Sequence, residues 1–515
     1  MYNKLSDIKN YDRGITNHDN TMKNIVANNH LGKISLNNRV LQKSHFFFNH
    51  RLDKKELGVS DQSQSGRCWI YSFTNMIQRH MLNKYEIEKF DISHIYITFW
   101  DKFEKCHTFL KRIEENKKLP LKHRIMYNLL KKPIDDGGQW SMIVNVVNKY
   151  GIIPKSSMKE TYHSKHTEYI NYILNLKLRQ YAHKLRNTKI KGKTIYYMMK
   201  NIYRLLVYFF GHPPKKINWS YVLKDKNKKD KKGKKGKHKK KDYVGNNDDT
   251  DDDTDEDDNE EDDTHADEDD DHKSKHKKGK QTQKNKKKDK KVNQKNNKKK
   301  TRKNKKNQRK YVYGVSPNEF YEKYVEFDVN DYILLMNAPN RDYYTKYRIK
   351  YNTNMYKEGI ETDYVNVPIE LIKKATRDSI TKKEPVWFSC DFVQQNSHKN
   401  SLLYDNVFNF EDVLNTTLFL DKRQALLYKQ VEVNHAMLMI GYHKQKNKIT
   451  KWLVENSHGK QGSNEKGEYY MNDKWFDKFV FEIVIHSKYV DNKVKKALKT
   501  KPKILPMWDP FGDVL

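Results

Sequence analysis

The chain has 515 residues, enough for two or three domains, and carries a formal net charge of +36. Only 36% of its residues are hydrophobic, largely because these almost vanish from residues 224–310, and the other 428 residues have the composition of an ordinary folded body. Residues 224–310 hold 33 Lys and Arg against 22 Asp and Glu and contribute +11, which leaves about +25 elsewhere. Such basicity favours polyanions without naming one, and a solvated basic surface is an equally good interpretation.

Three cysteines, Cys68, Cys106 and Cys390, lie far apart in the sequence. Their odd number gives no sign of a disulfide framework and favours a reducing compartment. Residues 1–14 carry charges where a signal peptide needs an apolar core, and no run of about 18 apolar residues occurs. We therefore expect a cytoplasmic protein that does not span a membrane, with no cofactor and no metal site.

An N-terminal arm, residues 1–60, comes before the first strong helix signal. From Cys68 to Met81, apolar residues recur at the spacing of one buried helix face, at positions 69, 70, 73, 76, 77 and 81. Further helical patterns cover roughly 84–131, 140–150 and 166–210.

Residues 224–310 run from a basic block through an acidic block to a second basic block. A segment without apolar residues cannot bury enough surface to order itself, so we predict a disordered insertion. A phosphate-binding or histone-like role is an alternative, but a tolerated surface-loop insertion is favoured.

The last third of the chain has the short apolar or alternating runs that are typical of strands. These runs are 385–392, 435–442, 451–457, 467–471 and 479–486. A helical first half and a strand-rich second half predict an α+β fold. The predicted divisions are the arm 1–60, a helical half with the candidate nucleophile 61–150, a helical region 151–223, the insertion 224–310, a mixed helical region 311–383, a β-rich half 384–500 and a tail 501–515.

The segment from Gln62 to Trp69, Gln-Ser-Gln-Ser-Gly-Arg-Cys-Trp, carries the first chemical signal. A cysteine in the first turn of a helix meets the positive end of the helix dipole, which favours the nucleophilic thiolate. Gly66 allows a close backbone approach, and Gln62 could point an amide N–H at a developing oxyanion beside the backbone N–H of Cys68. Cysteine before tryptophan is by itself more often a packing residue, but glutamine and glycine at these offsets favour catalysis.

A thiolate nucleophile needs a base and a group that orients the base. His435 opens one predicted strand, and Asn456 closes another strand 21 residues later. Adjacent strands would bring the Asn456 carbonyl to the far ring nitrogen of His435 and turn the ring toward Cys68. Any single histidine among 21 is more often incidental, but this arrangement is much rarer.

These three segments, QSQSGRCWIYS, VNHAMLMIGYH and WLVENSHGKQG, resemble the Cys, His and Asn boxes of papain-like cysteine peptidases. ITFWDKFEK, DDGGQWSMIVNVVNKYGIIPK, PVWFSCD and PMWDPFGDVL resemble the bleomycin hydrolase or aminopeptidase C branch. The resemblance covers nearly the whole chain apart from 224–310. It implies a papain-like fold with extra helical regions, assembled as a barrel-shaped homohexamer whose active sites face inward.

Carried onto this sequence, the resemblance implies that Cys68 is the nucleophile and that His435 is the general base and acid. It implies Asn456 as the residue that orients His435, and Gln62 as the oxyanion donor. The enzyme would be a thiol aminopeptidase that acts on peptides and related amides through an acyl-enzyme thioester.

The same resemblance implies substrate-binding roles for Gly137 and Gly138, in the segment that lines the non-primed side of the cleft. The alternative for that segment is a turn into a helix, with Trp140 in the core. It also implies that the carboxylate of Leu515 meets the free ammonium of the substrate. A frayed terminus is the alternative, but two aromatic residues among the last eight argue against it.

One residue departs from the family pattern, which has tryptophan where this chain has His458. Histidine is smaller and can be protonated, so we expect weaker cover of the His435–Asn456 contact and an altered pH profile. Two other functions stay open. One is a catalytically weak hexameric scaffold that binds nucleic acid through its basic surface, and the other is a papain-like endopeptidase, which the tail and the N-terminus disfavour.

Overall fold

The computed structural model describes residues 10–11, 13–52, 58–85, 87, 90–188, 192–222, 309–460 and 466–512. All of the predicted insertion except its last two residues lies outside the described residues, and so do Asp513 and Leu515. The predicted disorder of the insertion therefore stays a prediction.

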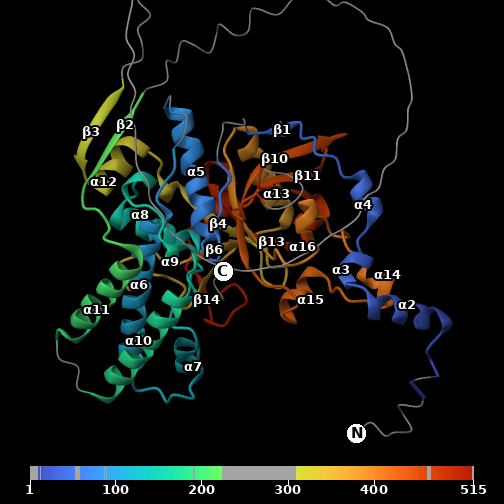
Figure 1. The fold of residues 1–515 in the computed structure, drawn as a ribbon, viewed down its shortest axis with the longest axis horizontal. Coiled ribbons are helices and arrows are strands. Elements are labelled where there is room, and N and C mark those ends of the chain that lie inside the picture. Colours follow the sequence, from blue (N-terminus) through green and yellow to red (C-terminus); the bar gives the residue numbers. More distant parts are fainter. Residues whose placement is uncertain are drawn as a thin grey trace, which may run out of the picture. The chain divides into compact units, whose positions relative to one another are not determined.

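Helices dominate the first half of the chain, as predicted, and stand beside a sheet built by the second half (Figure 1). The predicted helical pattern 84–131 is two helices, His94–Glu115 and Arg124–Lys131. Asn116 caps the end of the first, and the His123 ring caps the start of the second by accepting from the backbone N–H of Ile125. The helices of this half are α5 (Cys68–Lys84), α6 (His94–Glu115), α7 (Arg124–Lys131), α8 (Trp140–Tyr150), η1 (Lys155–Ser157), α9 (Tyr162–Lys165), α10 (Glu168–Asn187) and α11 (Thr194–Phe210).

A twelve-stranded mixed sheet forms the other half, with the order β14-β5-β6-β4-β13-β7-β10-β11-β12-β9-β8 and β1 paired to β10. All five predicted strand runs are strands. The strands are β1 (His50–Arg51), β4 (Tyr332–Met336), β5 (Thr345–Ile349), β6 (Asp363–Asn366), β7 (Val386–Cys390), β8 (Asn396–Ser397), β9 (Leu402–Leu403), β10 (His435–Gln445), β11 (Lys448–Glu455), β12 (Glu468–Asn472), β13 (Val480–His486) and β14 (Lys503–Leu505).

The region 311–383, predicted as a mixed helical region, supplies β4, β5 and β6 to this sheet. These strands have four or five residues, too short for a clear alternation to be read from the sequence. The remaining helices are α2 (Asn17–Asn28), α3 (Leu31–Ile34), α4 (Asn38–Lys43), α12 (Pro317–Phe320), η3 (Tyr321–Val325), η4 (Val329–Asp331), α13 (Ile369–Thr381), η5 (His398–Asn400), α14 (Phe410–Leu414), α15 (Lys422–Leu427), α16 (Asp473–Phe479), η6 (Ser487–Tyr489) and α17 (Asn492–Leu498).

Helix α5 joins the two halves. Every residue from Cys68 to Gln78 is buried, and not only the predicted apolar face, because α5 packs against β10 and β7 as well as α6 and α8. The fully buried Trp387 of β7 donates its ring N–H to the carbonyl of Trp69 (3.2 Å). The first turn of α5 is therefore held against the middle of the sheet.

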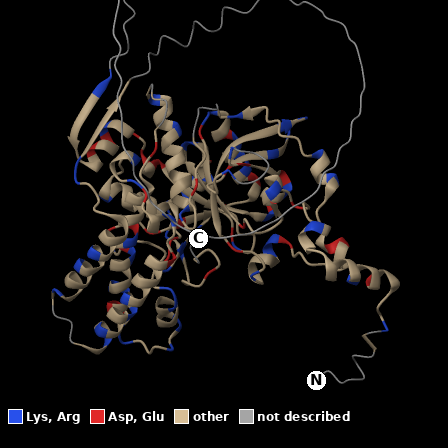
Figure 2. Cartoon of the chain, viewed as in Figure 1, with Lys and Arg blue, Asp and Glu red and all other residues tan. Residues whose placement is uncertain are grey.

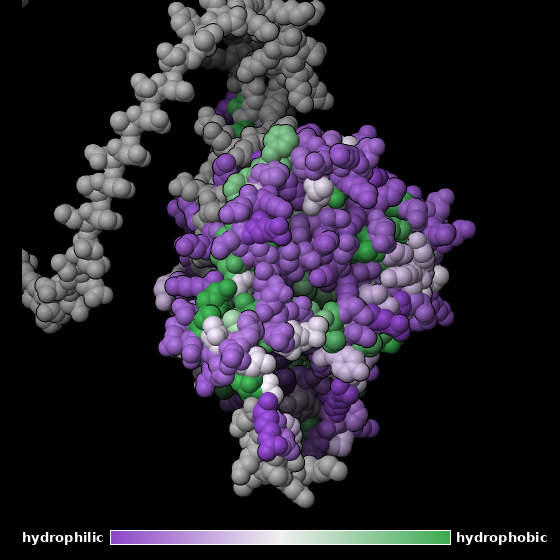
Figure 3. Space-filling model, turned by 90° about the vertical axis from the view of Figure 1, so that its right-hand side faces the viewer, coloured by the Kyte–Doolittle hydropathy of each residue, from purple (hydrophilic) through white to green (hydrophobic). Residues whose placement is uncertain are grey.

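The described surface is polar over both halves. Lys and Arg lie on elements of the helical half and of the sheet half (Figure 2), and the face in Figure 3 is mainly hydrophilic, with apolar side chains in separate patches. In the part of the chain that the structure describes, no helix has the length and apolar character needed to cross a membrane.

The insertion begins and ends on a two-stranded ribbon, β2 (Ile217–Tyr221) and β3 (Lys310–Val315), in which Tyr221 is paired with Lys310. Lys310 thus belongs to a strand and not to the insertion, whose predicted boundary was 310. Ile217 is buried, and the ring of Trp219 packs against Tyr85. The two ends of the insertion are therefore brought together by the pairing of β2 with β3.

Replacing residues 223–308 by a short Gly/Ser linker should leave the midpoint of thermal unfolding close to that of the full chain, because the paired ends of β2 and β3 need only a turn. Circular dichroism during heating measures the midpoint. A second variant that lacks 217–315 should unfold at a clearly lower temperature, since it loses the buried Ile217 and the Trp219 contact. An equal fall in both variants would contradict the ribbon as the boundary.

Candidate active site

Cys68 is the first residue of α5, where the sequence predicted a helix start. Its side chain is 3% exposed, and burial raises the pKa of the thiol to about 11. Hydrogen bonds from the backbone N–H groups of Ala436 and Trp69 lower the pKa of the thiol, but by less than burial raises it. The expectation that the helix terminus alone favours the thiolate is therefore outweighed by desolvation. Ala436 directly follows His435 in the chain, so this bond places the thiol at the start of the strand that begins with His435.

His435 and Asn456 meet because β10 and β11 form an antiparallel hairpin, with His435 at its first residue and Asn456 directly after its last. The Nε2 atom of His435 lies 2.7 Å from Oδ1 of Asn456. An amide oxygen only accepts, so Nε2 carries the proton and Nδ1 is free to act as a base. Burial, followed by the charge of His458, lowers the pKa of His435 to about 3.

The end of β11 is fixed by residues of α5. Asn75 donates to Oε1 of Glu455 (2.7 Å), and Arg79 forms an ion pair with the same carboxylate. The backbone N–H of Ser457 donates to Oδ1 of Asn456 (2.8 Å). Asn456 is thus held from both sides, and the helix that carries Cys68 also positions the strand that Asn456 follows.

Gln62 is buried close to these residues in the loop before α5. Its backbone N–H donates to the carbonyl of Ser457 (2.8 Å), and its Oε1 accepts a hydrogen bond from the Ser457 hydroxyl (2.6 Å). One N–H of its side-chain amide donates to the carbonyl of Ser65 (2.6 Å). The amide is therefore held at a fixed orientation with its nitrogen toward the segment that precedes Cys68.

His458 does cover the contact between His435 and Asn456. Its ring centroid lies 4.7 Å from that of His435, and its Nδ1 accepts a hydrogen bond from the Asn456 amide (3.2 Å). Phe392 adds a second ring, 4.6 Å from His435. His435 is only 5% exposed, so two smaller rings together give the cover that we expected to be weaker. In the sequence Phe392 is only the last residue of a strand run, and nothing in that run indicates that its ring lies against His435.

The two glycines after Asp136 have different surroundings. A Cβ at Gly138 would lie 2.5 Å from the ring of Trp69, whose Nε1 donates to the Asp136 carbonyl (2.8 Å). Gly138 is therefore required for close packing against Trp69, the residue after Cys68. The carbonyl of Gly137 accepts from the Lys105 ammonium, and Gly137 lines a cleft. Trp140 is buried, as the alternative interpretation of this segment expected.

That cleft has a volume of about 440 Å³ and contains tail residues as well as Gly137. Met507, Trp508 and Gly512 line it, and the guanidinium of Arg124 lies 3.9 Å from the Trp508 ring centroid. Its other charged lining residues are mostly basic: Lys105, Arg112, Lys131, Lys132, Lys350 and Lys429, with Asp135. Leu515, the remaining predicted substrate contact, lies outside the described residues.

The tail is ordered up to this point by its own contacts. Phe511 is 1% exposed, and Asp509 forms an ion pair with Arg341. Gly512 is closely surrounded, because a Cβ there would lie 2.9 Å from Ile349. These described residues do not fray, which was the alternative reading of the tail.

Comparison with known proteins agrees with this arrangement. The chain matches the Peptidase C1-like family over residues 4–255 and 293–512. It is 30% identical over 507 residues to human bleomycin hydrolase, covering 95% of this chain and 93% of the relative. It is 29% identical over 462 residues to aminopeptidase C of Listeria innocua, covering 88% and 86%. The crystal structure of PepW from Lactobacillus rhamnosis superposes with a TM-score of 0.80 at 27% identity, over 100% of this chain and 99% of that one. The predicted papain-like α+β fold is confirmed, and the chain belongs to the Peptidase C1-like family.

Proposed function

We propose that this chain is a thiol aminopeptidase that removes N-terminal residues from peptides and hydrolyses related amides. The observation that carries the proposal is the buried hydrogen bond between His435 and Asn456 (2.7 Å). The residue after His435, Ala436, binds the Cys68 thiol through its backbone N–H. The names of the relatives, bleomycin hydrolase and aminopeptidase C, support the same class of reaction.

In the proposed reaction, Cys68 and His435 start as a neutral pair, because burial raises the pKa of one and lowers that of the other. Nδ1 of His435 takes the thiol proton while the sulfur attacks the substrate carbonyl carbon. The carbonyl oxygen becomes an oxyanion, which accepts hydrogen bonds from the Cys68 backbone N–H and the second N–H of Gln62.

The oxyanion then collapses, the carbon–nitrogen bond breaks, and the leaving amine takes the proton from His435. This leaves the N-terminal residue as a thioester on Cys68. Water attacks the thioester and gives its proton to His435, and the departing sulfur regains a proton as the acid leaves. Asn456 keeps Nε2 of His435 hydrogen-bonded throughout, so the ring does not need to reorient.

We infer that the tail restricts the enzyme to free N-termini. Trp508 and Gly512 line the cleft beside Gly137. Gly512 is three residues before Leu515, whose carboxylate is the proposed ligand of the substrate ammonium. Cations that line the cleft, such as Arg124 and Lys429, would attract the carboxylates of Asp513 and Leu515 into it. A carboxylate held there would bind a substrate ammonium and block longer peptides.

The homohexamer stays a prediction from the resemblance, and the cytoplasm stays a prediction from the cysteines and the charged N-terminal residues. The nucleic-acid scaffold is the alternative to the enzyme. Strongly salt-dependent binding to nucleic acid with no turnover of aminoacyl substrates would favour it.

Replacing Cys68 by alanine should abolish hydrolysis of an aminoacyl fluorogenic amide, because no other thiol faces His435 from the start of α5. The controls are Cys106→Ala and Cys390→Ala, two residues that are also fully buried. Cys390 is paired with His435 across β7 and β10. Its variant therefore tests whether any thiol close to His435 contributes to turnover, or only that of Cys68. Both controls should keep most of the turnover, and wild-type rates in Cys68→Ala would sink the mechanism.

The acid limb of kcat/KM should lie below about pH 5. The lowered pKa of His435 keeps the imidazole neutral, and able to accept the thiol proton, until the pH falls well below the ordinary range of histidine.

His458→Gln removes a neighbouring charge that lowers the pKa of His435, so the acid limb should move to higher pH. His458→Trp, which restores the usual residue, also removes this charge, but its larger ring adds burial that lowers the pKa of His435, so its limb should move less than that of His458→Gln. A wild-type limb near pH 6.5, or no movement in either variant, contradicts this cause.

Removing residues 513–515 should reduce kcat/KM for free-amino substrates by about tenfold or more and allow cleavage of N-blocked peptides. Asp513→Ala is the matched control, because it keeps the Leu515 carboxylate and should remain an aminopeptidase. If Asp513 faces the cleft, this control should also lose any preference for releasing Lys or Arg. Unchanged rates and no activity on N-blocked peptides in the shortened enzyme would remove the tail from the mechanism.

A further inference from the structure

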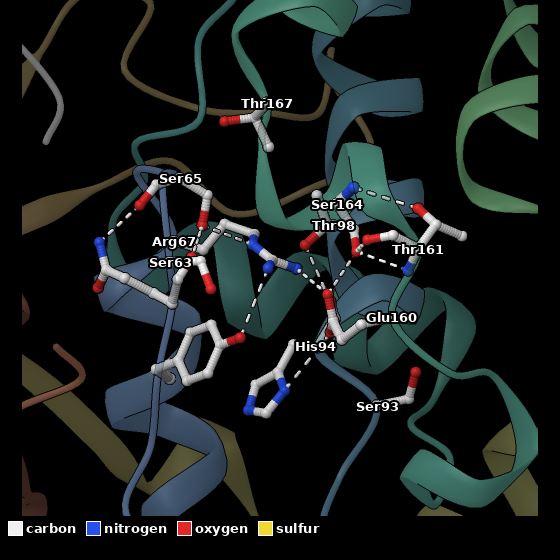
Figure 4. Close-up of polar contacts among 12 residues, drawn as sticks. Ser63, Ser65, Arg67, Ser93, His94, Thr98, Glu160, Thr161, Ser164 and Thr167 are labelled. Atoms are coloured by element: carbon white, nitrogen blue, oxygen red, sulfur yellow. Dashed lines mark hydrogen bonds and ion pairs between the residues drawn. The ribbon is translucent and has the colours of Figure 1, made fainter. Parts of the chain in front are cut away.

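The side chain of Arg67, the residue before Cys68, is fully buried and points toward Glu160 in the helical half (Figure 4). Its Nη1 lies 3.0 Å from Oε2 of Glu160, and its Nε donates to the hydroxyl of Ser65 (2.9 Å) (Figure 4). A buried guanidinium is stable only when such partners compensate its charge. No pattern in the sequence indicated a role for Arg67.

Glu160 is in turn held in its orientation. The hydroxyl of Ser164 donates to Oε2 of Glu160 (2.5 Å), and Nδ1 of His94 lies 3.7 Å from Oε1 (Figure 4). The ring of His94 stacks on Tyr71 of α5 at 3.8 Å. These contacts fix the carboxylate, and through it the guanidinium of Arg67, from three separate elements of the helical half.

The contacts continue from Arg67 to the proposed oxyanion donor. The Ser65 hydroxyl, which accepts from Arg67, donates to the backbone carbonyl of Gln62 (2.6 Å). The Gln62 amide donates back to the Ser65 carbonyl, and its Oε1 is bound by Ser457, the neighbour of Asn456. An unbroken series of polar contacts thus runs from Glu160 to the catalytic hairpin.

The loop that these contacts hold is strained. Ser63 has φ of +52°, a left-handed conformation that costs a non-glycine residue free energy and persists only where surrounding contacts impose it. Its backbone N–H donates to Asp61 (2.7 Å), and Gly66 is tied to Asp136 (3.1 Å). Between these two ties the carbonyl of Gln64 accepts from the backbone N–H of Thr167 (3.2 Å), and Arg67 holds the Ser65 hydroxyl. Loss of the Arg67 contact would leave the Ser65 hydroxyl, which binds the Gln62 carbonyl, without this donor.

We propose that Arg67 and Glu160 are positioning residues that fix the side chain of Gln62 toward the oxyanion through Ser65. This inference depends on the proposed role of Gln62 as oxyanion donor. Neither Arg67 nor Glu160 touches the reacting atoms. Their effect is on how well the Gln62 amide is aligned when the oxyanion forms.

The test is a double-mutant cycle on kcat/KM for an aminoacyl amide, with Glu160→Gln and Gln62→Ala separately and together. Glu160→Gln keeps the shape of the side chain but removes the charge that holds Arg67. We expect about a tenfold loss from it in the wild-type background, with KM nearly unchanged. We expect a loss of about 100-fold from Gln62→Ala, and almost no further loss when both changes are combined.

Glu104→Gln is the matched control, because Glu104 is another buried carboxylate of the helical half, paired with Lys149 at 2.9 Å and without contact to Gln62. It should lower the unfolding temperature but leave kcat/KM near wild type. Glu160→Asp, which restores the charge, should recover part of the activity. If Glu160→Gln does not fold, Ser65→Ala breaks the same series with a smaller change and enters the same cycle.

Losses that multiply in the double variant would overturn the positioning role, because Glu160 would then act independently of Gln62. An unchanged kcat/KM in Glu160→Gln or Ser65→Ala would overturn it as well. An unchanged kcat/KM in Gln62→Ala alone would instead remove the oxyanion role from the proposed function. The two failures are therefore distinguishable.

Discussion

The hydrogen bond between His435 and Asn456 is the contact on which the geometry of the site depends. It requires the first residue of β10 and the residue after β11 to lie side by side, and the hairpin of these two strands provides this. It also selects the tautomer of His435 that leaves Nδ1 as a base. Helix α5 then has to begin at this end of the hairpin, and its residues Asn75 and Arg79 bind Glu455 and so keep the helix and the strand in register.

Burial is the second constraint, and it explains why so many polar partners surround the site. Cys68, His435 and Asn456 are almost inaccessible, which favours neutral forms and makes any unpaired polar group costly. The amides of Gln62 and Asn456 are accordingly bound on both their oxygen and nitrogen sides. A site built in this way is organised before substrate arrives, since its donors are oriented by residues that do not take part in the chemistry.

Local sequence signals predicted α5, α8 and the strands that carry His435 and Asn456, because periodicity and strand length are properties of a few neighbouring residues. The resemblance to known peptidases linked segments hundreds of residues apart. Neither source could indicate that Gly138 lies under Trp69, that Phe392 covers His435, or that Arg67 pairs with Glu160, 93 residues further along the chain. Such contacts depend on how distant segments pack, and the short strands β4 to β6 were missed because they lack a clear alternation.

The central claim is that Cys68 alone carries the acyl group. A labelled, thiol-directed probe that mimics an N-terminal aminoacyl group can be added to the wild-type chain, and the modified peptide identified by mass spectrometry. The account predicts one label per chain, on Cys68, that is blocked by substrate and absent from Cys68→Ala. Labelling of Cys106 or Cys390 at the same rate, or equal labelling of Cys68→Ala, would contradict it.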